Sequence, residues 1–488
     1  MNKGSRKAII KVISMLIIVE GIAMIFSAAF SMSFEEWEAA KALGYTGTLI
    51  GILGLLVQFS YKFEKAKLGS RDGFLIAVIS WFVVSILGAF PFYFCGMDYS
   101  FVGSVFESVS GFTTTGSTVF DMDMMPKGII MWKSVSHWLG GMGILVLVIS
   151  VLPGLSKSGS MSYVESSGPM LQKVGTKYTD TTKFLYITYV SFTLIEFLLL
   201  LAGPLDVFDA LTNAFSSIST GGLMVTSSNR IAFRSVYVRV VILVFTIISS
   251  INYTLYHTAF KGKLKSFFMN TEVKVFISII AISSVLIALD LRFAGHYRSF
   301  WQAYKDGLCQ VVSFISTAGY YVCDYNRWPS FAVVVLFSLL LIGGCSMSTS
   351  GSLKVFRVVT LFKLIARGIF QKVHPRAVKA VVINKKAVPA VTVSEISTHI
   401  MLFFCVLFVS AAVLSLDNLD MTTTFTTALA VFTNTGLMLG PDGSSGYLGM
   451  FSDVSQIYMC FLMIAGRLEM YTLLIIFTKG FWKEDKAF

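Results

Sequence analysis

The stretch that decides the fold is residues 107–118, ESVSGFTTTGST, in which a hydroxyl-rich segment ends at Thr114-Thr115-Gly116. Similar stretches follow at long, nearly regular intervals: Ser219-Thr220-Gly221-Gly222, Thr317-Ala318-Gly319-Tyr320 and Asn434-Thr435-Gly436. One such segment means little, because helices commonly end at a glycine. Four copies at a long period, each between two apolar segments, predict an internal repeat.

The composition is that of a membrane protein. The 488 residues are 55% hydrophobic and only 14% charged, with a mean hydropathy of +0.74, whereas soluble proteins are about 25% charged. Many apolar runs reach the roughly 20 residues that a helix needs to span a bilayer. The first of them, 8–32, is too long for the core of a signal peptide and predicts a spanning helix. So many apolar runs exclude a water-soluble enzyme with an ordinary buried core.

The net charge of +12 raises the question of a nucleic-acid partner, and the distribution of the charge argues against one. Most of the 39 lysines and arginines fall in loops that would share one side of the membrane, and only Arg467 is left inside a predicted helix. The positive-inside rule places that side, and the N-terminus with it, in the cytoplasm. The six cysteines and five histidines show no metal-ligand or catalytic spacing, so no enzyme is predicted.

The apolar segments predict an all-α polytopic membrane protein in which two N-terminal helices, 8–32 and 41–61, precede four units. Each unit consists of a spanning helix, a short re-entrant helix, a Thr-Gly segment and a second spanning helix. The predicted spanning helices are 73–96, 128–153, 183–204, 235–260, 273–293, 329–367, 395–416 and 453–478. The re-entrant helices are 101–115, 207–220, 301–318 and 421–435, each too short to span.

These elements predict a division of the chain into an N-terminal extension, four pore repeats and one cytoplasmic link. The extension is 1–66, the repeats are 67–155, 156–262, 263–367 and 394–488, and the link is 368–393. Non-helical backbone at membrane depth is tolerated only inside protein or against a water-filled cavity. A single central pore, with the four repeats arranged pseudo-symmetrically around it, would meet this demand for all four Thr-Gly segments.

The Thr-Gly segments have the chemistry of a cation filter. Rings of backbone carbonyls replace the water shell of potassium in potassium channels, and glycine permits the backbone angles that turn successive carbonyls inward. The candidate filter residues are Thr114, Thr115, Gly116, Ser219, Thr220, Gly221, Gly222, Thr317, Ala318, Gly319, Asn434, Thr435 and Gly436. Potassium is expected at Thr115, Thr220, Ala318 and Thr435. Glu107 is expected to support the filter from a buried position.

A second candidate site lies in the helix 329–367, which is too long for one span. Its middle is rich in glycine and serine, which weaken a helix, so we expect a flexible intramembrane loop at 343–353 that blocks or admits ions. Arg467, midway along 453–478, is expected to face the pore and bond this loop; the alternative is a structural Arg–Glu pair between helices. Lys354 either joins the gate or extends to the cytoplasmic interface. The gate candidates are Gly343, Gly344, Cys345, Ser346, Met347, Ser348, Thr349, Ser350, Gly351, Lys354 and Arg467.

Together these segments resemble the TrkH-type potassium uptake proteins of the Trk/Ktr/HKT superfamily. The resemblance rests on the two extra N-terminal helices, the four Thr-Gly segments, Gly343-Gly-Cys-Ser-Met-Ser-Thr, His374-Pro-Arg-Ala-Val and Gly466-Arg-Leu-Glu. It implies a homodimer in the bacterial inner membrane with one pore per subunit, and filter-glycine roles for Gly116, Gly221, Gly319 and Gly436. It also implies a cytosolic partner, a TrkA-type ring of nucleotide-binding RCK domains that gates the pore. Departures from the family pattern are Met347, Ser350 and Ser352, where glycines are usual, and Leu437-Met-Leu-Gly after the fourth filter glycine.

The function expected from the sequence is potassium uptake driven by the membrane potential, with potassium as the transported ion and no organic cofactor on this chain. One charge moving inward across 100 mV gains about 2.3 kcal/mol. One alternative is a sodium-coupled Ktr-type subunit, against which the two extra N-terminal helices argue. Another is an alternating-access carrier of organic solutes, but carriers use inverted repeats with charged sites near the midplane. Four Thr-Gly segments of the same sense fit that class poorly.

Overall fold

The computed structural model describes residues 3–60, 70–143, 178–222, 235–377, 379–440 and 446–482. Within these ranges the chain is almost entirely helical, as predicted, with one two-stranded antiparallel sheet of β1 (Val382–Ile383) and β2 (Lys386–Ala387). Helices satisfy their own backbone hydrogen bonds, which a bilayer interior requires. Among the described residues six helices are long and apolar enough to cross a membrane, and two sharply bent pairs would raise the number to eight. The chain is therefore a multi-pass membrane protein.

The helices follow one another as an N-terminal pair and four groups. The pair is α1 (Lys3–Ser33) and α2 (Trp37–Ser60). The first group is α3 (Ser70–Leu87), α4 (Phe90–Phe94), α5 (Phe101–Phe112) and α6 (Lys127–Gly141). The second is α9 (Tyr178–Leu201), α10 (Val207–Ile218), α12 (Val236–Ser249) and α13 (Tyr253–Phe260). The third is α14 (Leu264–Phe268), α15 (Thr271–Phe293), α16 (Phe300–Ile315), α17 (Ser330–Ile342) and α18 (Val355–Val373). The fourth is α19 (Ala390–Leu414), α20 (Met421–Phe432), α21 (Asp453–Arg467), α22 (Tyr471–Leu474) and α23 (Lys479–Trp482).

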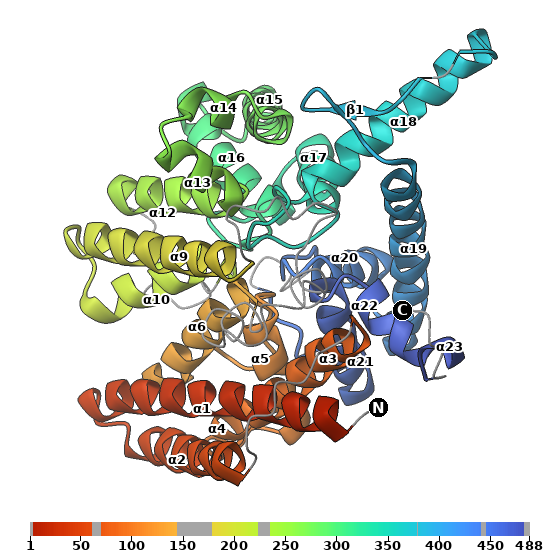
Figure 1. Ribbon diagram of the computed structural model, residues 1–488. Helices are drawn as coiled ribbons and strands as arrows, with labels where there is room; N and C mark the ends of the chain where they lie inside the picture. Colours follow the sequence, from red (N-terminus) through yellow and green to blue (C-terminus); the bar gives the residue numbers. More distant parts are fainter. Residues whose placement is uncertain are drawn as a thin grey trace.

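The four groups lie around a common centre, and the chain passes once around it from red through yellow and green to blue (Figure 1). The helix pairs that join neighbouring groups include α6 with α10, α12 with α16, α17 with α20, and α21 with α5. The last contact brings the end of the chain back to its first group. The arrangement therefore closes on itself and surrounds the short helices α5, α10, α16 and α20.

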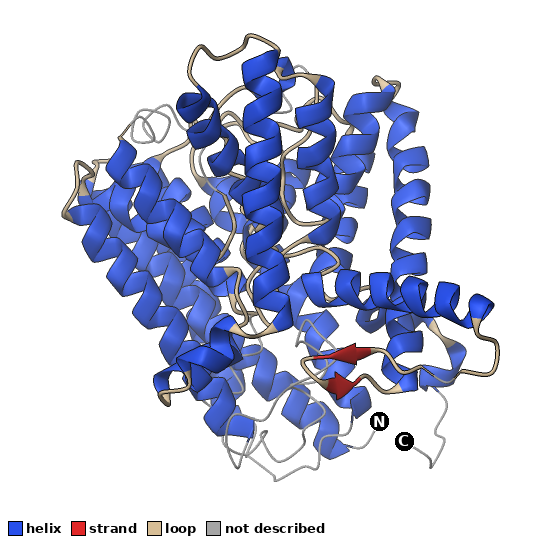
Figure 2. Cartoon of the chain, turned by 90° about the horizontal axis from the view of Figure 1, so that it is seen from above, coloured by secondary structure: helices blue, strands red, loops and turns tan. Residues whose placement is uncertain are grey.

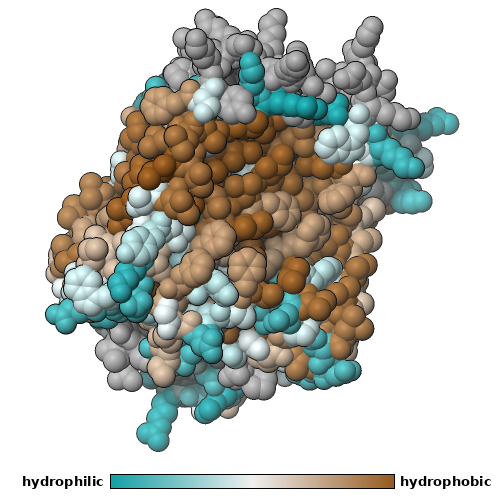
Figure 3. Space-filling view, turned by 90° about the horizontal axis from the view of Figure 1, so that it is seen from below, coloured by the Kyte–Doolittle hydropathy of each residue, from teal (hydrophilic) through white to brown (hydrophobic). Residues whose placement is uncertain are grey.

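The outer surface is apolar where a bilayer would contact it. Figure 3 shows a broad hydrophobic band across one face, with hydrophilic residues gathered above and below it. Large side chains such as Ile22, Leu194 and Phe408 are 55–63% exposed, whereas hydroxyl side chains such as Ser216 and Thr427 are fully buried. Exposed apolar residues around a polar interior are expected in a bilayer, because burying apolar side chains away from lipid yields no hydrophobic stabilisation.

Three of the four short helices start at a residue whose side chain caps them, and α16 does not. The side chains of Ser100, Asp206 and Asp420 accept hydrogen bonds from the backbone N–H groups of residues 103, 209 and 423, at the starts of α5, α10 and α20. Such caps satisfy a donor that the first turn of a helix leaves free. The turns that follow the C-terminal ends of all four short helices contact one another, so these ends meet at the centre of the molecule.

Two of the predicted spanning helices are not continuous but sharply bent. The segment 235–260 consists of α12 and α13, which meet at 94°, and 453–478 consists of α21 and a short helical segment, 471–477, at 111°. In the first, the Asn252 side chain caps a new helix by accepting the Thr254 N–H. In the second, Glu469 has φ 52° and Met470 has φ 5°, neither of which is helical. Arg467 consequently lies at the end of α21 rather than midway along a span.

The expected interruption of 329–367 is present. The segment consists of α17 and α18, and residues 343–354 between them are not helical. Figure 2 shows the two strands at one end of the long helices, below a helix that lies across the direction of the others. Val381 and Ile383, at the first strand, pack with Phe356 and Leu364 of α18. Residues 144–153 of the predicted helix 128–153, and residues 156–177 at the start of the predicted second repeat, lie outside the described residues.

Candidate selectivity filter and gate

The four short helices end in the same backbone turn. Thr114, Thr220, Thr317 and Asn434 have φ values of 57°, 55°, 57° and 56°. Two residues further on, Gly116, Gly222, Gly319 and Gly436 have φ values of 80°, 62°, 73° and 76°. The residue between them donates its N–H to the carbonyl five positions earlier, at 2.8–3.0 Å in all four turns. Left-handed backbone angles favour glycine, which explains the glycine that recurs in the sequence.

This geometry corrects the alignment of the second turn. The sequence analysis matched Gly221 with the glycines of the other turns, and Thr220 with Thr115, Ala318 and Thr435. In the structure Gly222 has the positive φ, and Gly221 donates to the Ser216 carbonyl as Thr115 donates to that of Ser110. Gly221 therefore corresponds to Thr115, Ala318 and Thr435, and Thr220 to the residue before them. The pair Gly221-Gly222 allows either alignment by sequence, and only the hydrogen bond decides between them.

The turns contact one another in a closed ring. A Cβ atom on Gly116 would lie 2.4 Å from the Gly221 carbonyl oxygen, and one on Gly222 would lie 1.7 Å from that of Ala318. A Cβ on Gly319 would lie 2.2 Å from the Thr435 oxygen, and one on Gly436 would lie 2.3 Å from that of Thr115. The first turn thus touches the second, the second the third, the third the fourth, and the fourth the first. None of these glycines has room for a side chain.

The carbonyl oxygens in this ring have no hydrogen-bond donor in the described part of the chain. Thr115, Ala318 and Thr435 are at most 1% exposed and Gly221 is also buried, yet no described residue donates a hydrogen bond to their carbonyl oxygens. Buried backbone carbonyls nearly always have a partner. Side chains hold the turns from behind: the Thr113 and Thr115 hydroxyls are 2.9 Å apart, and Asn434 Nδ2 donates to Thr115 Oγ1 at 3.1 Å. Such a set of buried oxygens could replace the hydration shell of a cation.

A buried ion pair supports the segment that follows the first turn. Glu107 Oε2 lies 2.5 Å from Lys133 Nζ, and both side chains are 0% exposed. The other oxygen of Glu107 accepts hydrogen bonds from the Thr118 hydroxyl at 2.6 Å and the Val119 N–H at 2.8 Å. Lys133 Nζ also donates to the Ser117 carbonyl at 3.2 Å. Glu107 is thus buried behind the turn, as expected, and it connects α5 and α6 to residues 117–119.

The loop between α17 and α18 lies against the ring. The Gly351 N–H donates to the Thr317 hydroxyl at 2.7 Å, and a Cβ on Gly351 would lie 2.2 Å from the Thr433 carbonyl oxygen. At its other end the Cys345 N–H donates to the Ser250 carbonyl at 2.9 Å, at the bend after α12. Met347 and Ser352, two of the positions that depart from family glycines, have φ values of 56° and 67°. Non-glycine residues in this region cost roughly 1–3 kcal/mol each, so the loop is held in a strained conformation.

Arg467 bonds the loop, as predicted, and also the end of α6. Its guanidinium donates to the carbonyls of Thr349 at 2.7 Å, Gly140 at 2.7 Å and Gly141 at 2.6 Å. The ion pair of this region joins Glu469 to a different arginine, Arg357 of α18. The geometry therefore places Arg467 among backbone carbonyls, with the Arg–Glu pair next to it.

Lys354 does not extend to the interface. It is 2% exposed, and its Nζ donates to the Ser350 carbonyl at 2.5 Å and lies 3.4 Å from that of Ser348. The alternative in which Lys354 reaches the cytoplasmic interface is therefore wrong. Its φ of 70° turns the chain so that the side chain folds back under the loop. The structure thus brings two basic side chains, Lys354 and Arg467, together on the carbonyls of the candidate gate.

Sequence reasoning missed several buried polar groups near the ring. Lys133 was not recognised as a charge inside a helix. Glu196 of α9 accepts the Ser217 hydroxyl at 2.5 Å behind α10, and both residues are fully buried. A Cβ on Gly221 would lie 2.7 Å from Cγ of the buried His137. Lys133 and His137 lie in α6 and Glu196 lies in α9, so each is an ionisable residue within a membrane segment. Such residues are rare there, and this rarity would have identified them.

Comparison with known proteins agrees with this architecture. The model of the TrkH family, described as cation transport proteins, matches residues 45–484. The chain is 31% identical to the Trk system potassium uptake protein TrkH of Halomonas elongata, over 98% of this chain and 100% of that protein. It is 32% identical to TrkH of Escherichia coli K12, over 98% and 99% of the two chains. The crystal structure of the potassium transporter TrkH from Vibrio parahaemolyticus is similar, with a TM-score of 0.86, 30% identity, and coverage of 99% of this chain and 100% of that one. The chain therefore belongs to the TrkH family of cation transport proteins.

Proposed function

We propose that this chain conducts potassium ions across the bacterial inner membrane, into the cell and down the membrane potential, without covalent chemistry. The observation that carries the proposal is the ring of four turns whose buried carbonyl oxygens have no donor among the described residues. A dehydrated alkali ion needs several oxygens at one place, and a buried carbonyl needs a partner. A potassium ion in the ring would receive the oxygen ligands that it needs, and the buried carbonyl oxygens would receive a partner.

The short helices favour a cation over an anion. The C-terminal ends of α5, α10, α16 and α20 meet at the ring, and each carries a partial negative charge of roughly half an electron. Four such ends stabilise a positive charge at the centre. They raise the energy of an anion by the same interaction.

We assign the gate to residues 343–354 together with Arg467. The loop contacts the ring through Gly351, and Arg467 holds the Thr349 carbonyl. Two basic side chains, Lys354 and Arg467, bond the loop that contacts the ring. The charge of the Arg467 guanidinium opposes ion passage while the loop remains in this place. Opening requires the loop to move together with the carbonyls that Arg467 binds.

The N-terminus and the link 368–393 belong on the cytoplasmic side in this proposal, because the basic residues concentrate in these loops. Several relatives are named as parts of a Trk system. We infer from that name, and from the resemblance in sequence, a homodimer regulated by a cytosolic nucleotide-binding TrkA-type subunit.

The direct test is rubidium uptake into proteoliposomes that contain the purified protein. Uptake is expected under an imposed inside-negative potential, with no requirement for a sodium or proton gradient when each gradient is varied separately. Empty liposomes give the background. Uptake that needs a sodium gradient would instead support the sodium-coupled alternative. Uptake that is insensitive to the potential would contradict the proposed driving force.

Replacing Arg467 by alanine is expected to raise basal rubidium flux roughly tenfold. The change removes a charge-assisted hydrogen bond to the Thr349 carbonyl and a cation beneath the filter, and one such bond is worth about 1.5–3 kcal/mol. The matched control is Arg327→Ala, since that side chain is 85% exposed and pairs only across one turn with Asp324. Flux at or below the wild-type level in the Arg467 variant, with normal thermal stability, would rule out the barrier.

A further inference from the structure

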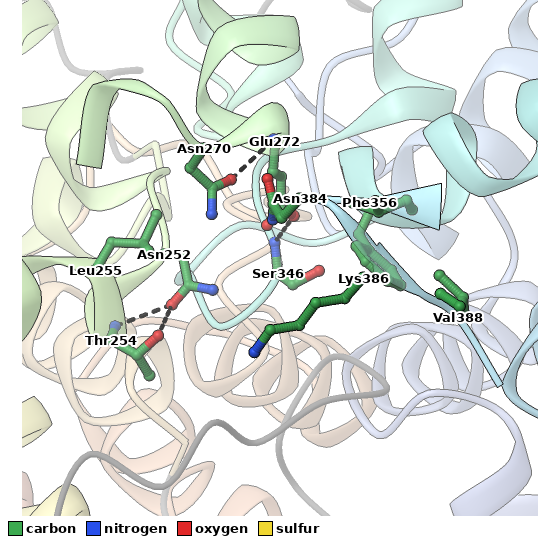
Figure 4. Close-up of a pocket in the computed structure, with 12 residues that line it drawn as sticks. Asn252, Thr254, Leu255, Asn270, Glu272, Ser346, Phe356, Asn384, Lys386 and Val388 are labelled. Atoms are coloured by element: carbon green, nitrogen blue, oxygen red, sulfur yellow. Dashed lines mark hydrogen bonds between the residues drawn. The ribbon is translucent and has the colours of Figure 1, made fainter. Parts of the chain in front are cut away.

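A cavity lies directly behind the loop between α17 and α18, and the proposed filter mechanism does not use it. Its volume is about 80 Å³, several times the roughly 10–15 Å³ that one water requires by this measure. It lies between the starts of α13 and α15, the loop, the first turn of α18 and the hairpin of β1 and β2 (Figure 4). Thr254, Glu272 and Ser346 on its floor are buried, while Asn384 and Lys386 on its rim are exposed.

The hydrogen bonds of three asparagines in this cavity leave donors free. The Oδ1 atoms of Asn252, Asn270 and Asn384 accept the N–H groups of Thr254, Glu272 and Thr271 at 2.8–2.9 Å. These bonds fix each amide with its oxygen towards the backbone. No described residue accepts a hydrogen bond from the three Nδ2 groups. The cavity therefore presents three amide donors whose orientation the helix caps determine.

Two more groups add to this donor set. Lys386 extends past Ser346 towards Asn252 and Thr254 (Figure 4), and it forms no ion pair with a described residue. The Ser346 hydroxyl, in a residue 8% exposed, has no hydrogen-bond partner in the described part of the chain. The carboxylate of Glu272 on the floor already accepts the Ser346 N–H at 2.5 Å. Its charge faces that of Lys386 across the cavity, so the lining is rich in donors and close to neutral.

We propose that this cavity binds a small oxyanion of phosphate size, and that the bound anion holds the loop in the position seen here. Donors without acceptors, one ammonium group and a volume of this size suit a compact ligand with several oxygens. Ser346 belongs to the loop and Lys386 to the hairpin, so one ligand would join the two. A ligand that binds one arrangement stabilises it by mass action. Because this arrangement is the proposed closed gate, the anion lowers ion flux. The effect on flux, unlike the binding, rests on the proposed function.

The test uses the full-length protein and inorganic phosphate, with chloride at equal ionic strength and pH as the reference. Phosphate is expected to raise the midpoint of thermal unfolding in detergent and to lower rubidium flux in proteoliposomes. Asn384→Asp keeps an oxygen for the Thr271 N–H but replaces the donor by a repelling carboxylate. Lys386→Met removes the ammonium group. Each variant is expected to bind phosphate roughly tenfold more weakly, as the loss of one hydrogen bond to a charged group predicts.

Lys385→Met is the matched control, because Lys385 is exposed on the same hairpin and does not line the cavity. It should retain the wild-type response to phosphate. An unfolding midpoint that phosphate does not change, or that it changes equally in all variants, overturns the site. A shift in the unfolding midpoint without a change in rubidium flux would contradict the proposal that the bound anion holds the loop in its closed position. A wild-type protein that conducts no rubidium in chloride refutes the proposed function instead, and leaves the binding result intact. A phosphomonoester is tested in parallel; a response to it alone would show that the oxyanion is carried on a larger molecule.

Discussion

Substitution of Gly319 by serine is expected to reduce potassium-over-sodium selectivity by roughly tenfold or more. Gly319 has φ 73°, and a Cβ there would lie 2.2 Å from the Thr435 carbonyl oxygen. The serine must displace that carbonyl or distort its own turn, at a cost of roughly 1–3 kcal/mol. Since about 1.4 kcal/mol corresponds to a factor of ten in an equilibrium constant, a comparable loss in potassium coordination accounts for the expected change. The measurement is competition of sodium with rubidium uptake in proteoliposomes. Gly116→Ser, next to the Gly221 carbonyl, is expected to act in the same direction.

The control for Gly319→Ser is Gly295→Ser. Gly295 has a similar φ of 78°, but no atom lies within 4 Å of the position of its Cβ. Both substitutions strain the backbone, and only the first disturbs a carbonyl of the ring. If both variants keep wild-type ion ratios, the ring is not the filter. If both lose selectivity equally, strain alone is responsible and the contact between neighbouring turns is irrelevant.

The four turns could be predicted because their chemistry is local. A hydroxyl-rich helix that ends in a left-handed turn requires glycine at one position, and that requirement is visible in Thr114-Thr115-Gly116 and its copies. The alignment of the second copy could not be predicted, because Gly221 and Gly222 both tolerate the special angle. The closed order of the contacts depends on atoms roughly a hundred residues apart in three contacts and more than three hundred apart in the fourth, between Gly436 and Thr115. No local pattern contains this information.

Among the breaks in the helices, one could be predicted from the sequence and two could not. The break before α18 has a dense run of glycine and serine, and it was predicted. The bends after α12 and α21 have no run of comparable length: Ser249-Ser250 precedes Asn252, and Gly466-Arg467 precedes Glu469. One capping side chain and one residue with positive φ determine them, together with the packing of the bent segments. A hydropathy profile averages over many residues, so it cannot reveal a bend that one or two residues determine.

Replacing Lys133 by methionine is expected to lower the free energy of unfolding by about 3–5 kcal/mol, the usual cost of removing one partner from a buried ion pair. Methionine has nearly the length of lysine, so little packing is lost, but the Glu107 carboxylate remains fully buried without its cation. The segment 117–119 also loses the bond from Lys133 to the Ser117 carbonyl. Thermal or denaturant unfolding of the detergent-solubilised protein measures the loss.

Two further variants separate the ion pair from a general loss of packing in the Lys133→Met protein. Lys41→Met removes the cation of an exposed pair between Lys41 and Glu38, whose side chains are 54% and 70% exposed, and it should change stability far less than Lys133→Met, because solvent screens an exposed pair. The double variant Glu107→Gln, Lys133→Met removes the uncompensated charge, while the glutamine oxygen can still accept from Thr118 and Val119. It should therefore be more stable than Lys133→Met alone. If the double variant is no more stable than the single one, the loss comes from packing around α6, and the charge of Glu107 does not determine the stability of the segment behind the filter.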